Sequence, residues 1–290
     1  MIMRKIQIAL LGCLLLASCK VDVDSIVPYF SKIQDDGFGS QISFDVYASG
    51  TWSCATVSEI KGLTVTPSTG NGQTMVTVTI PENNTGAGLL SYLNFTCGSA
   101  KTPVAVFHEI PSMNLGNRSY PARKLADGNW WTCTNMGSIA AGKNVSAADF
   151  STNTGIWYPC KPDTGEADNT KAGIEAKGYL YSPAELAGLC PEGWHLPTTD
   201  EWETLLAKSG YDALKEAGFN LAAIGYVTEG TAYAGLGQIT KYACRVDDDA
   251  SSTQNAMILT EKESGTILSM GFYGSKDGVS VRCVKDTPVE

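Results

Sequence analysis

Residues 41–110 alternate apolar and polar side chains in short runs, and residues that form turns separate the runs. Ile42, Phe44 and Val46 share one face of the first run, because successive strand residues point to opposite sides. The runs are 41–46, 51–56, 63–67, 75–80, 90–97 and 103–108. Gly- and Asn-rich segments at 68–72 and 81–86 lie between them. This pattern predicts five or six strands in an all-β sandwich, with Trp52 in its core.

Residues 111–290 have a different texture, with scattered aromatic residues and glycines and a helix signal near residue 198. Thr198 or Thr199 can cap that helix, and acidic residues follow near the positive end of its dipole. Its apolar stripe would comprise Trp202, Leu205, Leu206 and Tyr211. A second helix is predicted over 182–187, with Pro183 in its first turn, and a last strand over 279–284.

The first residues have the pattern of a secretory leader. Arg4 and Lys5 precede an apolar run over 6–16, which is shorter than the roughly 20 residues that a membrane-spanning helix needs. Residues 16–19 read Leu-Ala-Ser-Cys, which is similar to a bacterial lipobox. We therefore expect a signal peptide over 1–18, lipid on Cys19, and a polar lipidated tether over 19–40. An ordinary signal peptide with a chance cysteine is the alternative.

The net charge and the cysteine content limit which cellular compartment and which classes of partner fit the sequence. The net charge is −9, and −11 once Arg4 and Lys5 leave with the leader, which disfavours nucleic acid as a partner. Seven cysteines follow Cys19, and an exported protein meets oxidising conditions, so we expect disulfides with at least one thiol left over. Cys54 and Cys97 lie on predicted strands of the sandwich and could bridge it.

The sandwich segment, 41–110, resembles the BACON domains of Bacteroidetes surface proteins. The resemblance rests on Trp52, on Leu-Thr-Val-Thr-Pro-Ser-Thr-Gly over 63–70, on the strand 76–80 and on Asn-Asn-Thr over 83–85. It departs from the family at 86–88, where Gly-Ala-Gly replaces the usual basic residue, and in the last strand, which lacks the usual closing Gln. The resemblance implies a spacer domain, with glycan binding as the alternative.

Residues 113–286 resemble the Fibrobacter succinogenes major paralogous domain. The match rests on Gly-Tyr-Leu-Tyr-Ser over 178–182, Cys-Pro-Glu-Gly-Trp-His-Leu-Pro-Thr over 190–198, Glu-Trp at 201–202, Gly-Phe-Asn at 218–220, and Ser-Val-Arg-Cys-Val-Lys-Asp over 280–286. It implies an α+β domain with a C-type-lectin-like layout. The chain departs from the family at 242–245, where Tyr-Ala-Cys-Arg stands for Tyr-Trp-Ser-Ser.

Two pairs of residues inside the segments that resemble the family are candidates for a functional role. Cys190 and Cys283 lie in the two strongest phrases, and the resemblance favours a disulfide between them over a reactive thiol pair. The pair Trp194–His195 could stack on and hydrogen-bond a sugar. Because the phrase leads into a helix, we favour a structural role, with Trp194 in the core and His195 bonded near the start of the helix.

No enzyme template fits the sequence. Only His108 and His195 could serve as the base of a nucleophilic triad, and there is no nucleophile elbow, phosphate loop or dinucleotide fingerprint. No Cys-x-x-Cys spacing suggests zinc, and we read the acidic run 247–249 as a solvated loop rather than a calcium site. We therefore expect no catalytic residue, no metal and no cofactor.

Aromatic residues are the remaining binding candidates. Adjacent strand residues face opposite ways, so one of Trp130 and Trp131 is expected at a surface. We select Trp130, Trp131, Trp157 and Tyr233, with Tyr158, Tyr226 and Tyr273 as further candidates.

Together these patterns predict an outer-membrane lipoprotein of the cell envelope, exposed at the surface or facing the periplasm. It would be a non-catalytic recognition or adhesion module that binds a glycan or an envelope protein through its C-terminal domain. A structural or assembly component of a surface appendage is the alternative, and a glycan hydrolase with two scattered acids is the third hypothesis.

Overall fold

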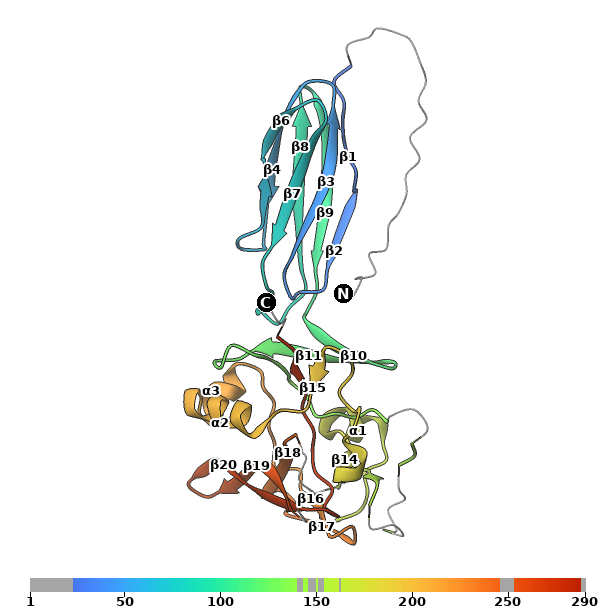
Figure 1. Ribbon diagram of the computed structural model, residues 1–290, viewed down its shortest axis with the longest axis vertical. Helices are drawn as coiled ribbons and strands as arrows, with labels where there is room; N and C mark the ends of the chain where they lie inside the picture. Colours follow the sequence, from blue (N-terminus) through green and yellow to red (C-terminus); the bar gives the residue numbers. More distant parts are fainter. Residues whose placement is uncertain are drawn as a thin grey trace. The chain divides into compact units, whose positions relative to one another are not determined.

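The computed structural model describes residues 23–139, 143–145, 150, 154–161, 163–245 and 253–287. The chain divides into two compact units, Met1–Pro111 and Ser112–Glu290, here called the N-terminal unit and the C-terminal unit. Strands predominate in both, and the helices belong to the C-terminal unit (Figure 1).

The N-terminal unit consists of two sheets that face each other (Figure 1). One has the order β1 (Ile26–Pro28), β3 (Ser40–Ala48), β7 (Thr74–Ile80), β5 (Thr64–Thr66). The other has the order β2 (Lys32–Asp35), β9 (Ala100–His108), β8 (Leu89–Cys97), β4 (Thr51–Val57), β6 (Thr69–Asn71). Neighbouring strands are antiparallel, except that β2 runs parallel to β9.

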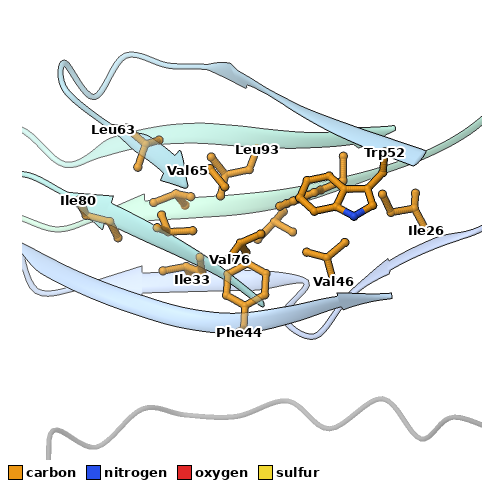
Figure 2. Packing of buried hydrophobic residues seen from close by; sticks show 14 of the residues in the cluster. Ile26, Ile33, Phe44, Val46, Trp52, Leu63, Val65, Val76, Ile80 and Leu93 are labelled. Atoms are coloured by element: carbon orange, nitrogen blue, oxygen red, sulfur yellow. The ribbon is translucent and has the colours of Figure 1, made fainter. Parts of the chain in front are cut away.

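The core of this unit follows from the alternation of its strands. Phe44 and Val46 on β3, and Val76 and Ile80 on β7, point inward from one sheet (Figure 2). Trp52 on β4 points inward from the other sheet, is 1% exposed, and packs on Phe95 with 5.8 Å between ring centres. Burial of one face of each sheet removes apolar surface from water and supplies the main stabilisation of a sandwich.

The segment expected to be a tether is partly folded. Ile26 on β1 and Ile33 on β2 are each 3% exposed and belong to the sandwich core. The expected tether over 19–40 therefore ends before Ile26. The polar residues around these two strands suggested a linker, but single inward-facing isoleucines are enough to hold short edge strands against the core.

The expected bridge between Cys54 and Cys97 does not form, and both are free thiols in this structure. Cys54 lies directly opposite Phe95 in the β4–β8 ladder, so Cys97 is displaced from it by two residues. Diagonal neighbours in an antiparallel pair have Cα atoms about 7–8 Å apart, which is too far for a disulfide without movement of the backbone.

The C-terminal unit contains several small sheets in place of one sandwich. A five-stranded sheet has the order β10 (Ser112–Leu115), β11 (Arg118–Lys124), β12 (Trp130–Thr132), β21 (Val284–Lys285), β15 (Trp194–His195). A three-stranded sheet comprises β18 (Ile239–Ala243), β19 (Thr253–Lys262) and β20 (Gly265–Gly274). Two pairs complete the set: β13 (Ile156–Trp157) with β14 (Leu180–Tyr181), and β16 (Tyr226–Thr228) with β17 (Ala232–Ala234).

The helices are α1 (Lys171–Lys177), α2 (Thr199–Lys208) and α3 (Tyr211–Glu216), with a 3₁₀ turn at Pro183–Glu185. Thr198 caps α2 in a capping box: its hydroxyl accepts from the N–H of Glu201, whose carboxylate accepts from the N–H of Thr198. The predicted helix over 182–187 is only the 3₁₀ turn, α1 was not predicted, and Tyr211 begins α3 instead of extending the stripe of α2.

The interior of this unit is fastened by polar and covalent links. The side chain of Arg282 is fully buried against the rings of Phe219 and Tyr242. It donates to Asn135 Oδ1 at 2.7 Å and to the carbonyl of Thr132 at 2.9 Å, and also to the carbonyl of Asn220. Beside it, Cys283 forms a disulfide with Cys190, the pair that the sequence favoured.

Candidate functional site

The two adjacent tryptophans selected from the sequence are both buried. Trp131 is 0% exposed and packs on Trp202 at 4.6 Å and on Phe219 at 5.8 Å between ring centres. Trp130 is 8% exposed. The expectation of one surface tryptophan was wrong because β12 lies between β11 and β21, inside the sheet, where both faces of a strand can be covered.

The other selected aromatic residues do not form a surface site either. Trp157 is 0% exposed and packs with Leu180 and Val227, with Tyr233 partly buried against this cluster. The Tyr233 hydroxyl donates to the carbonyl of Tyr158 at 2.9 Å. Tyr273 is 1% exposed, and Tyr158 and Tyr226 are partly buried. These side chains support the fold, so a binding site must be sought elsewhere.

His195 joins two carboxylates at the start of α2. Its Nε2 lies 2.9 Å from Glu201 Oε1, and its Nδ1 lies 2.6 Å from Asp286 Oδ1. The hydrogen bond with Glu201, together with Asp286, raises the pKa of His195 although partial burial opposes this. Burial by itself would raise the pKa of Glu201, but hydrogen bonds from His195 and Thr198 outweigh it and lower that pKa. The imidazole thus ties α2 to the segment after β21, which agrees with the structural role favoured from the sequence.

A cleft of about 880 Å³ lies on the C-terminal unit, between the β10–β11 hairpin and α1. Such a volume falls within the range of small-ligand sites. Three segments far apart in the sequence line it: Leu115, Gly116, Asn117, Arg118; Ser138, Ile139; and Asn169, Lys171, Ile174, Glu175, Tyr179, with Gly188 at one side.

A tight hairpin positions the first of these segments. Leu115 pairs with Arg118, which leaves Gly116 and Asn117 as a two-residue loop. Gly116 has φ +59°, a conformation that glycine adopts without strain at the first position of a II′ turn. Asn117 is exposed at the tip, so the turn presents its amide to solvent beside the cleft.

Arg118 locks this hairpin to α1. Its guanidinium donates to the carbonyls of Gly137 at 3.1 Å and Glu175 at 3.1 Å, and it lies over the ring of Tyr120. A side chain at Gly137 would clash with this guanidinium, because an added Cβ would lie 2.0 Å from its Nη1. The Arg118 side chain therefore holds the cleft wall through hydrogen bonds to the backbone carbonyls of Gly137 and Glu175.

Helix α1 is held equally firmly. The Thr170 hydroxyl caps it by accepting from the N–H of Gly173 at 3.0 Å, and itself donates to Asp168 at 2.6 Å. Lys177 Nζ lies 2.9 Å from Asp168 Oδ2. The hydrogen bonds from Thr170 and Lys177 lower the pKa of Asp168. The helix consequently presents Lys171 and Glu175 from a fixed backbone.

The groups that remain available in the cleft are mixed. Asn117 and Asn169 are exposed and offer amide groups, and Ile139 is 37% exposed beside them. Lys171 and Glu175 are also exposed and form an ion pair with each other, with 3.7 Å between Nζ and Oε1. Donors and acceptors next to apolar surface suit a ligand with both hydroxyl groups and C–H faces. The sequence interpretation missed this cleft because polar residues in three separate segments carry no local motif.

The described residues hold no group of three or more His, Cys, Asp or Glu side chains that could bind a metal ion. The acidic run 247–249 and the lipidation residue Cys19 lie outside the described part of the chain. Among the helices of that part, none combines the length and apolar character needed to cross a membrane.

Part of the C-terminal unit resembles a known protein family. The matching segment begins just before β12, includes α1, Cys190 and α2, and ends at the end of α3. Residues 126–216 match the Fibrobacter succinogenes major domain. The match includes the capping box of α2 and His195, and it contains Asn169, Lys171 and Glu175 of the cleft, whereas the hairpin 115–118 precedes it. The cleft thus lies between the hairpin 115–118 and the segment that matches this family.

Comparison with whole proteins adds little. No curated protein matches the chain. A Bacteroides ovatus GH5 xyloglucanase in complex with a XXXG heptasaccharide is 16% identical, with a TM-score of 0.29 over 32% of this chain and 20% of that one. A structure of a chaperone–tip adhesin complex of CFA/I fimbriae biogenesis is 10% identical, with a TM-score of 0.27 over 50% of this chain and 78% of that one. The chain spans a fifth of the xyloglucanase, and likenesses this weak carry no argument about function.

Proposed function

We propose that this protein is a cell-envelope lipoprotein whose C-terminal unit recognises a glycan without cleaving it. The cleft between the β10–β11 hairpin and α1 is the observation that carries the proposal. The lipobox-like sequence before Cys19 supports export and lipid anchoring in the outer membrane. The BACON-like N-terminal unit would act as the spacer, and the C-terminal unit would have a lectin-like layout.

The chemistry of the cleft supports a glycan as the ligand. The amide side chains of Asn117 and Asn169 each offer both donors and an acceptor, which match sugar hydroxyl groups. Leu115, Ile139 and Tyr179 provide apolar surface for the C–H faces of a sugar ring. The backbones that carry the polar groups are fixed by Arg118 and Thr170, so little ordering entropy is lost on binding.

The arrangement of acids supports recognition over hydrolysis. Glycoside hydrolysis commonly uses two carboxyl groups flanking the bond, whereas the described lining of the cleft includes one, Glu175. The carboxylates of Glu201 and Asp286 do converge, but on the imidazole of His195, and Glu201 is also bonded to Thr198. Both have structural partners.

A glycan-array screen of residues 20–290, followed by calorimetric titration of the best ligand, tests the proposal. Asn117→Ala and Asn169→Ala should each weaken binding by about tenfold, because each removes hydrogen bonds worth about 1 kcal/mol. Asn71→Ala, an exposed asparagine in the N-terminal unit, is the matched control and should bind normally. Absence of any glycan ligand, or equal binding by all three variants, would contradict the proposal. Release of sugar products would instead support a hydrolase.

A further inference from the structure

Arg118 carries a charge that no carboxylate in the described part of the chain neutralises. Its guanidinium donates to the carbonyls of Gly137, Ile174 and Glu175, which are neutral peptide groups. The side chain is half-buried in the wall of the cleft. Because removal of a charge from water is costly, a partly buried charge is usually paired with an opposite one. An anion bound in the cleft would supply that opposite charge.

The guanidinium of Arg118 also has an unused donor. A guanidinium has five N–H groups, and the bonds to the three carbonyls come from Nη1 and Nη2. Nε has no acceptor among the residues that the structure describes. A carboxylate accepts from a guanidinium in short, charge-assisted hydrogen bonds. Arg118 can therefore keep its bonds to the wall of the cleft and bind a carboxylate at the same time.

Tyr179 offers a second donor in the same cleft. Its side chain is 8% exposed and lines the cleft. Its hydroxyl has no hydrogen-bond partner within the described ranges and is not fully enclosed, so a ligand can reach it. Burial raises the pKa of Tyr179, although the nearby charge of Arg118 opposes this, so the hydroxyl keeps its proton. A phenol in such a position normally donates to an acceptor, and a bound ligand can provide one.

The other charges of the cleft offset each other. Lys171 and Glu175 form an ion pair, with 3.7 Å between Nζ and Oε1. Of the described residues that line the cleft, Arg118 alone is then left with an uncompensated charge. The chain as a whole has a net charge of −9, so the cleft differs in sign from most of the molecule. A local positive charge attracts anionic ligands and repels cationic ones.

We propose that the ligand of the cleft is an acidic glycan, whose uronic-acid carboxylate binds Arg118 and Tyr179. This inference rests on the proposed recognition of a glycan and adds the chemical class of the sugar. One carboxylate oxygen accepts from the unused N–H of the guanidinium, and the other accepts from the Tyr179 hydroxyl. The asparagine amides and the apolar side chains of the cleft contact the hydroxyl groups and the C–H face of the sugar ring.

A glycan array that carries uronic-acid oligosaccharides beside their neutral, carboxyl-reduced counterparts tests the inference. The protein of residues 20–290 should bind the acidic member of each matching pair at least about tenfold more tightly, because the carboxylate adds charge-assisted hydrogen bonds. Equal binding of the two members overturns this inference and leaves glycan recognition standing. Preference for sulfated over carboxylated sugars also overturns it. Absence of binding to any glycan overturns both this inference and the proposed function.

Two substitutions locate the carboxylate. Tyr179→Phe removes only the hydroxyl and keeps the ring, so it should weaken binding of the acidic oligosaccharide about tenfold and leave any binding of its neutral counterpart unchanged. Arg118→Gln should abolish the preference for the acidic member. Arg123→Gln removes the same charge on the same strand outside the cleft lining, and as the matched control it should retain the preference.

The variant at Arg118 also breaks the bonds that hold the hairpin to α1. Circular dichroism and the melting temperature show whether it keeps its fold, and where it does not, Tyr179→Phe decides. A full preference for the acidic oligosaccharide in Tyr179→Phe overturns the inference. Loss of the preference in Arg123→Gln also overturns it, because the effect would then come from net charge and not from the cleft.

Discussion

The two units solve the problem of stability in different ways. In the N-terminal unit, strands of up to nine residues enclose one apolar core between two sheets. In the C-terminal unit the sheets are small and the core is divided among three clusters, so a buried arginine, a disulfide and a histidine between two carboxylates connect the parts. A divided core depends on specific links, whereas a continuous core depends on total buried area.

The two units also differ in which large apolar side chains they expose. Most exposed large apolar side chains of the described residues belong to the N-terminal unit, including Tyr29 just after β1, Tyr47 on β3 and Tyr92 on β8. The C-terminal unit buries its tryptophans at 130, 131, 157 and 202. Buried tryptophans therefore mark the core of both units, and the N-terminal unit carries several exposed tyrosines in addition.

Replacement of Arg282 should have the largest effect on stability, and it should affect the C-terminal unit alone. Replacement of Arg282 by Met leaves Asn135 Oδ1 and the carbonyls of Thr132 and Asn220 unpaired in the interior, which should cost about 3–6 kcal/mol of unfolding free energy. Denaturant titration should show the loss only in the C-terminal unit. Trp52 is the one tryptophan before residue 112, so in a Trp52→Phe background tryptophan fluorescence reports on the C-terminal unit alone, and the difference from the parent protein reports on the N-terminal unit. Equal loss in both units would contradict the division.

Removal of the disulfide should give the next largest difference in stability between the two units. The Cys190→Ser, Cys283→Ser double variant opens a link between residues 93 apart and should lower the unfolding free energy of the C-terminal unit by about 2–5 kcal/mol. Added reductant should have the same effect on the parent protein. The N-terminal unit should be unaffected, and Cys54→Ser serves as its control because Cys54 is a free thiol.

The smallest effect, and the sharpest contrast, comes from pH. His108 and Asp35 are buried in the N-terminal unit, with His108 Nε2 3.4 Å from Asp35 Oδ2. Burial lowers the pKa of His108 although Asp35 opposes this. A lowered pKa means that the unfolded chain binds the proton more readily, so this contribution to stability is lost as pH falls below about 6.5.

His195 should respond in the opposite direction. Its pKa is raised, so its stabilisation is fully present below about pH 6.5 and is lost as pH rises through the folded-state value. Acidification from about pH 8 to about pH 6 should thus weaken the N-terminal unit and strengthen the C-terminal unit. His108→Gln and His195→Gln should each flatten the pH dependence of its own unit in calorimetry. Slopes of the same sign in both units would refute this contrast.

Local patterns predicted the parts of the fold that depend on local physics. Strands of period two placed Phe44 and Val46 in the core, and the Thr198–Glu201 spacing predicted the start of α2. Strands β1 and β2 were missed because they are short, and β2 in addition pairs with a distant strand, β9, about seventy residues later. Few local signals distinguish such an edge strand from a linker.

The candidate site was less predictable than the fold. Trp131 appeared available because strand neighbours face opposite ways, yet two neighbouring strands and Trp202 enclose it. Conversely, Asn117 and Asn169 have no sequence motif, and only the packing of a hairpin against α1 brings them to one cleft. A binding surface assembled from separate segments is a property of tertiary contacts.

The position of β21 has a consequence for the order of biogenesis. Val284 pairs with Trp131 on one side and with His195 on the other, so one of the last strands to be synthesised is internal to its sheet. The N-terminal unit has all its strands once His108 has emerged, whereas the C-terminal unit must wait for residues 282–285. During synthesis the first unit can fold while the second is still incomplete. Chaperones that bind unfolded chains would therefore encounter mainly the C-terminal unit, with its tryptophans still uncovered.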